Sequence, residues 1–253
     1  MLTKNQLNQI SKDSQIDNFT ILREYLQLVF LNYLYQEKSA EKIYFKGGTC
    51  LRLLYNSPRF SEDLDFSTKL SKKELDVLLD KIINKIQKEI SQVQLSFVYQ
   101  GKNSLRYKIK YQAEDFKYAL NIRIDFSFEN ILLKPNISKP ETKIPINFLP
   151  LIMHLSKQEI LAEKTRAFLK RAKGRDIFDF WFLLDKNIFL DAKLIQKKIK
   201  TSFDKNKFLL KIKKYPSKKL LMDLAKFLPM YYRKIIPLLK EKILKRLSEK
   251  FRP

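Results

Sequence analysis

The spacing of apolar residues changes near residue 150 of this 253-residue chain. Before that point, stretches with the helical repeat of about 3.6 residues alternate with stretches in which every second residue is apolar, the repeat of a half-buried strand. After it, only the helical repeat occurs. The pattern predicts an α/β protein with a sheet and helices in residues 1–150, followed by a helical lobe in residues 151–253. An all-α fold is the alternative.

The predicted elements follow from these repeats. Apolar residues at helical spacing predict one buried helical stripe over residues 1–38. Ser71 stands three residues before Glu74, and the two are expected to form a capping box at the start of a long helix. Residues 130–150 contain four prolines and are expected to form a loop or a short extended stretch. Gly174 is expected to cap the helix before it. The other predicted helices are 49–55, 71–90, 156–172, 176–184, 190–202, 218–228 and 231–249, and the predicted strands are 43–45, 63–66, 93–99, 105–111 and 118–128.

The chain carries 51 Lys and Arg against 27 Asp and Glu, a formal net charge of +24. Its hydrophobic content of 45% is that of a folded protein, so the charge points to a polyanionic partner, with nucleic acid first. Residues 186–253 hold 21 of the basic and 5 of the acidic residues, hence 16 of the 24 excess charges. Lysines such as Lys197, Lys198 and Lys200 are predicted to hold an RNA backbone. A solvated lysine-rich face is the alternative, and binding to a membrane surface is not expected.

Cysteine and histidine are too few for several kinds of site. Cys50 is the only cysteine, which excludes an internal disulfide and a cysteine-based zinc site. His154 is the only histidine, which argues against a Ser-His or Cys-His pair and a two-histidine metal site. Both residues are expected to have packing or surface roles. With no signal peptide and no apolar run near the ~20 residues of a membrane helix, a cytoplasmic protein is expected, whose chemistry relies on carboxylates, lysines and a hard metal ion.

Three aspartates are candidate metal ligands. Asp63 and Asp65 are two residues apart on a predicted strand, so their side chains point to the same face. Adjacent carboxylates repel unless a cation joins them, and Mg²⁺ prefers such ligands. Asp125 lies on the polar face of a later strand, and the three acids are predicted to hold two Mg²⁺ or Mn²⁺ ions about 3.5–4 Å apart, an arrangement used for displacement at phosphorus. Simple surface charge, or pairing of Asp125 with Arg123 or Arg106, is the alternative.

A pair of glycines separates the predicted strand 43–45 from the predicted helix 49–55. The start of a helix exposes backbone N–H groups that bind phosphate, and glycine lets the phosphate approach the backbone closely. Gly47 and Gly48 are therefore candidate nucleotide-binding residues, with an ordinary turn as the alternative. Their polar neighbours are further candidates of the same kind, although the serine among them could merely cap a turn: Lys46, Thr49, Arg59 and Ser61.

The order of strand, Gly-Gly, short helix, D-x-D and later strand acid resembles the DNA polymerase β-like nucleotidyltransferase superfamily. More narrowly, FKGGTCLRLLYNSPRFSEDLDFS resembles the signature of the AbiEii/AbiGii nucleotidyltransferase-like toxins of bacterial toxin–antitoxin and abortive-infection systems. A second block, Glu163 to Asp179, matches the E-K-x-x-A…R…R-D-x-x-D run of that family, and the resemblance covers roughly residues 40–185. It implies a nucleotidyltransferase-type mixed sheet, an NTP substrate, an acceptor that is expected to be tRNA, and a cognate antitoxin.

The second block supplies five more candidates. Lys164 and Arg171 are seven residues apart and share a helix face, while Asp176 and Asp179 are one turn apart and could hold Lys164 or Arg175 in place. Lys164 is expected to steady the triphosphate as pyrophosphate leaves, and the resemblance implies catalytic importance for the lysine and the acidic end of the block. A basic helix with ordinary ion pairs is the alternative.

The leading hypothesis is metal-dependent transfer of a nucleotide from an NTP to an acceptor, with release of pyrophosphate. Asp63 and Asp65 are expected to bind both ions, and Asp125 to complete the acceptor-side ion and help activate the attacking hydroxyl. Two other functions stay open: a catalytically silent basic protein that binds RNA or regulates, and nucleotidyl transfer to a small molecule.

Overall fold

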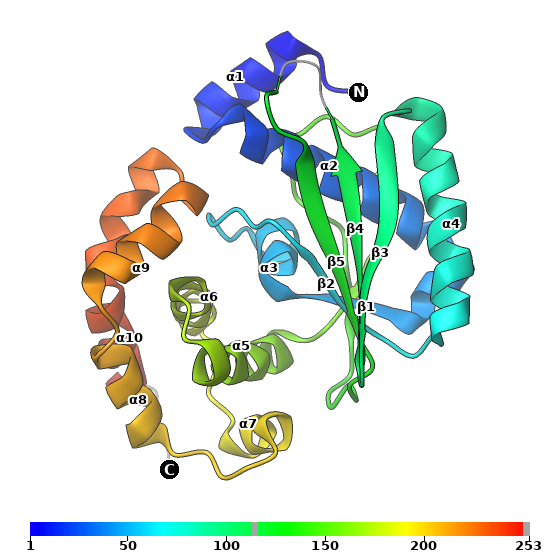
Figure 1. The fold of residues 1–253 in the computed structure, drawn as a ribbon. Helices are drawn as coiled ribbons and strands as arrows, with labels where there is room; N and C mark the ends of the chain where they lie inside the picture. Colours follow the sequence, from blue (N-terminus) through cyan, green and yellow to red (C-terminus); the bar gives the residue numbers. More distant parts are fainter. Residues whose placement is uncertain (113–115, 250–253) are drawn as a thin grey trace. The chain divides into compact units, whose positions relative to one another are not determined.

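The computed structural model describes residues 1–112 and 116–249. They fall into two compact units, Met1–Leu155 and Ser156–Pro253 (Figure 1). The first unit contains a sheet with helices, and the regular structure described in the second unit is helical. The α/β fold predicted from the apolar spacing is therefore confirmed. The first unit ends at Leu155 rather than at residue 150, because a short strand just before Leu155 belongs to its sheet.

The sheet of the first unit has seven strands in the order β3-β4-β5-β2-β1-β7-β6. The pairs β2–β5 and β1–β7 are parallel and the other pairs are antiparallel, so the sheet is mixed. Because β2 lies between β5 and β1, the D-x-D segment occupies the interior of the sheet. The strands are β1 (Ile43–Lys46), β2 (Leu64–Thr68), β3 (Val93–Gly101), β4 (Ser104–Tyr111), β5 (Leu120–Ser127), β6 (Asn136–Ser138) and β7 (Ile152–His154).

One face of the sheet is apolar and the other is polar. On β5 every second side chain is buried, as a strand with one covered face requires. Helices α2 and α4 contact each other, and they also contact β5 and β3 respectively (Figure 1). The opposite face of β5 carries its polar residues, Asn121, Arg123, Asp125 and Ser127. The helices of this unit are α1 (Lys4–Ser14), α2 (Asn18–Tyr35), the 3₁₀ helix η1 (Lys38–Lys42), α3 (Gly47–Tyr55) and α4 (Lys72–Glu89).

The prediction of one helical stripe over residues 1–38 was wrong in one respect. The segment forms two helices, α1 and α2, because Gln15 adopts a left-handed backbone and ends the first. Asp17 then caps the second by accepting a hydrogen bond from the Thr20 N–H. The capping box of Ser71 and Glu74 is present as predicted, with both reciprocal hydrogen bonds.

The proline-containing segment 130–150 includes the strand β6, which agrees with the expected short extended stretch, although the sequence did not give its bounds. β6 and β7 are three residues long, too short for a repeat to be recognised. His154 on β7 is fully buried and hydrogen-bonds to the Tyr55 hydroxyl at 3.0 Å and the Ser138 hydroxyl at 3.0 Å. It therefore has the packing role expected of it.

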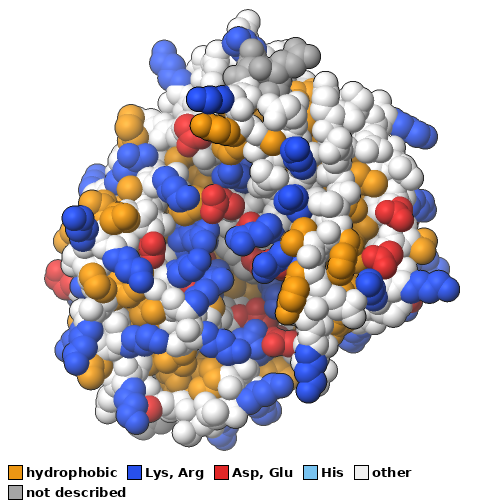
Figure 2. Space-filling model, viewed as in Figure 1, with side chains coloured by type: hydrophobic (Ala, Val, Ile, Leu, Met, Phe, Trp, Pro, Cys, Tyr) orange, Lys and Arg blue, Asp and Glu red, His pale blue; other side chains and the backbone are white. Residues whose placement is uncertain are grey.

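In the second unit, the largely buried helix α6 (Gly174–Asp185) is accompanied by α5 (Lys157–Arg171), α7 (Ala192–Ile199), α8 (Lys205–Lys213), α9 (Ser217–Leu224), the 3₁₀ helices η2 (Ala225–Phe227) and η3 (Met230–Leu238), and α10 (Leu239–Glu249). Their buried residues include Leu194, Ile195, Phe208, Ile212, Leu220, Leu224 and Ile243. Lys and Arg side chains are spread widely over the face shown in Figure 2, with few Asp and Glu among them.

Three predictions for the second unit are corrected. Helix α8 was not foreseen, because lysines interrupt its apolar stripe. The helix predicted over 231–249 begins as η3 and becomes α-helical only at Leu239, since Pro237 cannot donate a backbone hydrogen bond. Gly174 begins α6 instead of capping α5. Ala172, in a left-handed conformation, takes the cap position.

Candidate active site

The turn from β1 into α3 contains the two predicted glycines. Gly47 has a φ of +80°, a backbone conformation that L side chains rarely adopt, and a Cβ there would overlap Oδ2 of Asp65. A Cβ on Gly48 would overlap Nη2 of Arg59 and lie 2.8 Å from Oγ of Ser61. The backbone at the start of α3 therefore lies directly against Asp65, Arg59 and Ser61.

Polar neighbours of this turn fix the loop between α3 and β2. Lys46 Nζ donates a hydrogen bond to Ser127 Oγ at 2.9 Å, and Thr49 Oγ1 donates to the carbonyl of Asp63 at 2.5 Å. Arg59 is buried, and its Nη1 donates to the carbonyl of the next residue at 2.9 Å. Thr49 and Arg59 thus hold the loop that carries Asp63, whereas Lys46 links β1 to β5.

The strand register brings two of the three predicted aspartates together. Asp65 on β2 and Asp125 on the parallel strand β5 are directly opposite each other, and Lys46 on β1 is opposite Asp65 from the other side. Neighbouring strands are about 4.8 Å apart, so the two carboxylates project from adjacent positions of one face. Asp63 comes immediately before β2.

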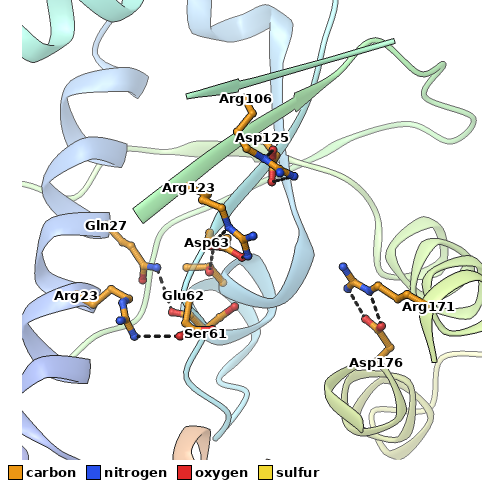
Figure 3. Close-up of polar contacts among 11 residues, drawn as sticks. Arg23, Gln27, Ser61, Glu62, Asp63, Arg106, Arg123, Asp125, Arg171 and Asp176 are labelled. Atoms are coloured by element: carbon orange, nitrogen blue, oxygen red, sulfur yellow. Dashed lines mark hydrogen bonds and ion pairs between the residues drawn. The ribbon is translucent and has the colours of Figure 1, made fainter. Parts of the chain in front are cut away.

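Asp125 and Asp63 are each paired with an arginine (Figure 3). Arg106 Nε and Nη2 donate to the Asp125 carboxylate at 2.6 and 3.3 Å. Arg123 Nε donates to Asp63 Oδ1 at 2.9 Å, and its Nη2 donates to the other oxygen. The hydrogen bond with Asp63 raises the pKa of the Arg123 guanidinium, which keeps this ion pair charged. The alternative in which Asp125 pairs with Arg106 is thus the one that the structure contains.

The donor chemistry of the site suits a hard cation. Asp65 and Asp125 offer carboxylate oxygens from adjacent strands, and like charges at such a separation are stabilised by a positive charge between them. Among residues 1–112 and 116–249, no group of three or more Asp, Glu, His or Cys side chains converges on one point, and Asp63 faces Arg123 instead. The site for two ions on three aspartates stays a prediction.

The second block forms a buried ion network between α5 and α6. Lys164 Nζ lies 2.7 Å from Asp179 Oδ2 and 3.8 Å from Asp176 Oδ1. Arg171 forms a two-pronged pair with Asp176 at 2.9 and 2.8 Å (Figure 3), and both aspartates are fully buried. The guanidinium of Arg175 lies 5.0 Å from the centre of the Phe227 ring. Lys164, one of the two basic partners considered from the sequence, thus contacts both acids.

A second buried cluster on α5 was missed. Lys198, predicted to face RNA, is buried, and its Nζ lies 2.6 Å from Glu159 and 3.1 Å from Glu163. This prediction was therefore wrong for Lys198, because a buried ammonium paired with two carboxylates does not face a polyanion. The signal was available: Glu159 and Glu163 are four residues apart and share one face of α5.

Comparison with known proteins decides the family. The family model for the AbiEii nucleotidyl transferase toxin of type IV toxin–antitoxin systems matches residues 29–249. The chain belongs to the AbiEii family. This membership places the protein among nucleotidyltransferase toxins, as the D-x-D and E-K-x-x-A segments indicated. No helix in the described ranges is long and apolar enough to cross a membrane.

Solved structures of other proteins share the fold of this chain. MenT4, a nucleotidyltransferase toxin from Mycobacterium tuberculosis, superposes with a TM-score of 0.66 at 16% identity, over 100% of this chain and 91% of MenT4. JHP933 from Helicobacter pylori gives a TM-score of 0.53 at 18% identity, over 93% of this chain and 96% of that protein. These likenesses confirm the nucleotidyltransferase-type mixed sheet followed by helices.

A curated relative matches a shorter part of the AbiEii chain. The protein aq_aa25 of Aquifex aeolicus (strain VF5) is 25% identical over 163 residues, which are 63% of this chain and 66% of the relative. The match thus spans slightly less than two thirds of the relative's length.

Replacing Gly47 with alanine is expected to destabilise the first unit by about 1–3 kcal/mol, because φ is positive there and the new Cβ would overlap Asp65. Urea unfolding followed by circular dichroism measures the change. Nucleotidyl transfer should fall as well, since the Asp65 carboxylate must move away from the turn. A variant with an unchanged midpoint and unchanged transfer would show that the turn tolerates a side chain.

Proposed function

We propose that this AbiEii toxin is a metal-dependent enzyme that transfers a nucleoside monophosphate from an NTP to an RNA acceptor, with tRNA as the acceptor class. The observation that carries the proposal is the register of Asp65 and Asp125 beside a turn at which Gly47 leaves no room for a side chain. Two adjacent carboxylates can bind a divalent ion, and the N–H groups at the start of a helix can bind the phosphates of a nucleotide.

The proposal assigns a role to each residue of the first block. Asp65 and Asp125 would hold a divalent ion, Mg²⁺ or Mn²⁺, with Asp63 joining them on release from Arg123. Such an ion would supply neutralisation of the charge that develops on the phosphates. The N–H groups of Gly47 and Gly48 would donate to a phosphate at the start of α3. Lys46, Thr49, Arg59 and Ser61 would keep the turn and its loop in position for that contact.

The second block would act through Lys164. Its ammonium is the candidate group that neutralises the outer phosphates as pyrophosphate leaves. Asp176 and Asp179 hold this ammonium at 3.8 and 2.7 Å, and Arg171 in turn holds Asp176. We assign these three residues, with Arg175, to positioning. The first unit is proposed as the catalytic lobe, and the second as the helical lobe that carries the second block and the basic surface.

The acceptor and partner follow from charge and family. Residues 186–253 carry an excess of 16 positive charges, which is complementary to an RNA backbone and predicts binding that weakens with salt. The family belongs to type IV toxin–antitoxin systems, so a cognate antitoxin is the expected protein partner. Since RNA acceptors and NTPs are present in the cytoplasm, that is the proposed site of action.

The decisive experiment incubates the protein with each of the four labelled NTPs, Mg²⁺ and total tRNA. Label on RNA from at least one NTP supports the proposal. Label that appears only on small molecules, or RNA binding without transfer from any NTP, would contradict it. Growth arrest on expression, relieved by co-expression of the neighbouring antitoxin gene, tests the toxin role separately.

Chelation is expected to remove the activity. EDTA in excess should abolish transfer, and added Mg²⁺ or Mn²⁺ should restore it. Because a ligand that binds the native state raises stability, Mg²⁺ should also raise the melting temperature of the wild type more than that of Asp65→Asn. Transfer that persists in EDTA, with no effect of Mg²⁺ on melting, would rule out the metal site.

A further inference from the structure

A β-bulge in β3 turns one aromatic side chain onto the polar face of the sheet. Phe97 is paired with Tyr107, but Tyr99 is paired with Arg106, so the register shifts by one residue between them. Two contacts with α4 confirm the change: Lys72 lies 4.7 Å from the centre of the Phe97 ring and donates to Gln100 at 3.0 Å. Phe97 and Gln100 therefore share the α4 side, and Tyr99 between them faces the other way.

This reversal puts Tyr99 in line with the candidate active site. The paired positions form a single row across five strands, from β3 to β1: Tyr99, Arg106, Asp125, Asp65 and Lys46. Tyr99 is two strands from Asp125, about 10 Å at the usual strand spacing. Its side chain is 53% exposed. The ring leans along β3 toward Gly101, where an added Cβ would lie 2.8 Å from the Tyr99 hydroxyl, and it stays on the face that carries the carboxylates.

Cations extend from the row along β4. Arg106, Lys108 and Lys110 alternate with the buried residues of that strand, so all three face the polar side with Tyr99. Alternate residues are about 6.8 Å apart, and the three cations span roughly 14 Å. β3 and β4 contain no Asp or Glu, and no ion pair of Lys108 or Lys110 occurs within the described part of the chain.

We propose that this surface, Tyr99 with Arg106, Lys108 and Lys110, binds the single-stranded end of the acceptor RNA. It is called the β3–β4 strip below. Tyr99 would stack on a base, and Lys108 and Lys110 would contact successive phosphates. The inference rests on the proposed function, since it names where the acceptor of that reaction lies.

The length and composition of the β3–β4 strip favour RNA over the NTP. A triphosphate is compact, because its phosphorus atoms are joined through single oxygens, whereas the phosphates of a polynucleotide are separated by sugars. Arg106 is held by Asp125, so the cations that decide between the two ligands are Lys108 and Lys110, which lie about 6.8 Å apart. This separation matches phosphates separated by sugars better than the adjoining phosphates of one triphosphate. An exposed aromatic ring beside lysines is also the usual platform for single-stranded nucleic acid, where every base offers a face to stack on.

The test measures binding of a short fluorescein-labelled single-stranded RNA to the full chain without NTP, so that no transfer occurs. Tyr99→Ala should raise the Kd roughly 5- to 150-fold, and Tyr99→Phe should leave it nearly unchanged, because the ring is retained. Phe97→Ala is the matched control. Phe97 is similarly exposed, on the same strand, but on the α4 face. The Phe97→Ala variant should therefore bind the RNA with the wild-type Kd.

The lysines and the ligand class are tested in parallel. The double variant Lys108→Gln/Lys110→Gln should lower the slope of log Kd against log salt by about 1.4, at about 0.7 per phosphate contact. RNA with a 3′-terminal 4-thiouridine should cross-link to peptides of β3 or β4. Equal RNA affinity of Tyr99→Ala and wild type, or loss of ATP binding with unchanged RNA binding, would overturn the proposal.

The outcomes separate this inference from the proposed function. If the wild type transfers no nucleotide to RNA but Tyr99→Ala still weakens RNA binding, the proposed transfer reaction is wrong and the proposed RNA binding by the β3–β4 strip is supported. If the wild type labels RNA and Tyr99→Ala binds and labels RNA equally well, the transfer stands and the β3–β4 strip is wrong.

Discussion

Asp65→Asn is expected to lower the rate of nucleotidyl transfer by at least about 10³-fold while leaving the protein folded. The substitution keeps the shape of the side chain and one oxygen, but it removes the negative charge that lies against Gly47 and opposite Asp125. Initial rates with a labelled NTP and tRNA measure the loss. Growth arrest on expression should disappear with it.

The matched control for this variant is Asp13→Asn, an exposed aspartate near the end of α1. It makes the same chemical change away from the site and should leave transfer unaltered. Thermal unfolding of Asp65→Asn should stay close to that of the wild type, because asparagine keeps the size of the side chain and one oxygen acceptor. A variant that keeps more than a tenth of the wild-type rate would contradict the assignment of Asp65 as a catalytic carboxylate.

The second large effect is expected for Asp179→Ala, which should destabilise the second unit by about 3–5 kcal/mol. The change removes the closer of the two carboxylates that contact Lys164 and leaves a buried ammonium with Asp176 at 3.8 Å. Trp181 is the only tryptophan, is buried on α6 two residues from Asp179, and belongs to the same unit. Its fluorescence in a urea titration therefore reports the unfolding of this unit directly.

A double variant distinguishes a lost ion pair from a lost fold. Lys164→Met/Asp179→Leu replaces both charges by apolar side chains, and it should recover most of the stability lost in Asp179→Ala, because the cost arises from the unpaired charge. Transfer should remain absent from the double variant if Lys164 contacts the phosphates. If Asp179→Ala unfolds at the wild-type urea concentration, the ion network contributes nothing to the second unit.

Much of the fold and part of the site were predictable because they depend on regular repeats. The alternation in β5 placed Asp125 on a polar face, and the spacing of Lys164, Asp176 and Asp179 predicted their contact. The strict register between β2 and β5, which sets Asp65 opposite Asp125, follows from strand pairing and is not encoded in either segment alone. Sequence reasoning could name the two aspartates but not their distance.

Features that depend on single residues or on long-range partners were not predictable. The segment 93–99 was expected to alternate regularly, whereas the bulge after Phe97 reverses the direction of Tyr99. No repeat signals a one-residue insertion, because the bulge is defined by the strand opposite it. Lys198 was mistaken for a surface lysine for a similar reason: its partners, Glu159 and Glu163, lie more than thirty residues earlier.

The pairing of Asp63 with Arg123 and of Asp125 with Arg106 means that loading of the proposed site is an exchange of partners. Each carboxylate that accepts a metal ion sets free a guanidinium, a group whose fork of N–H donors suits phosphate as well as carboxylate. Before a metal ion binds, each arginine thus neutralises one of these carboxylates, and each carboxylate occupies the N–H donors of its arginine. The same strands would then supply both the ligands of the ion and the counter-charges of the phosphates that arrive with it.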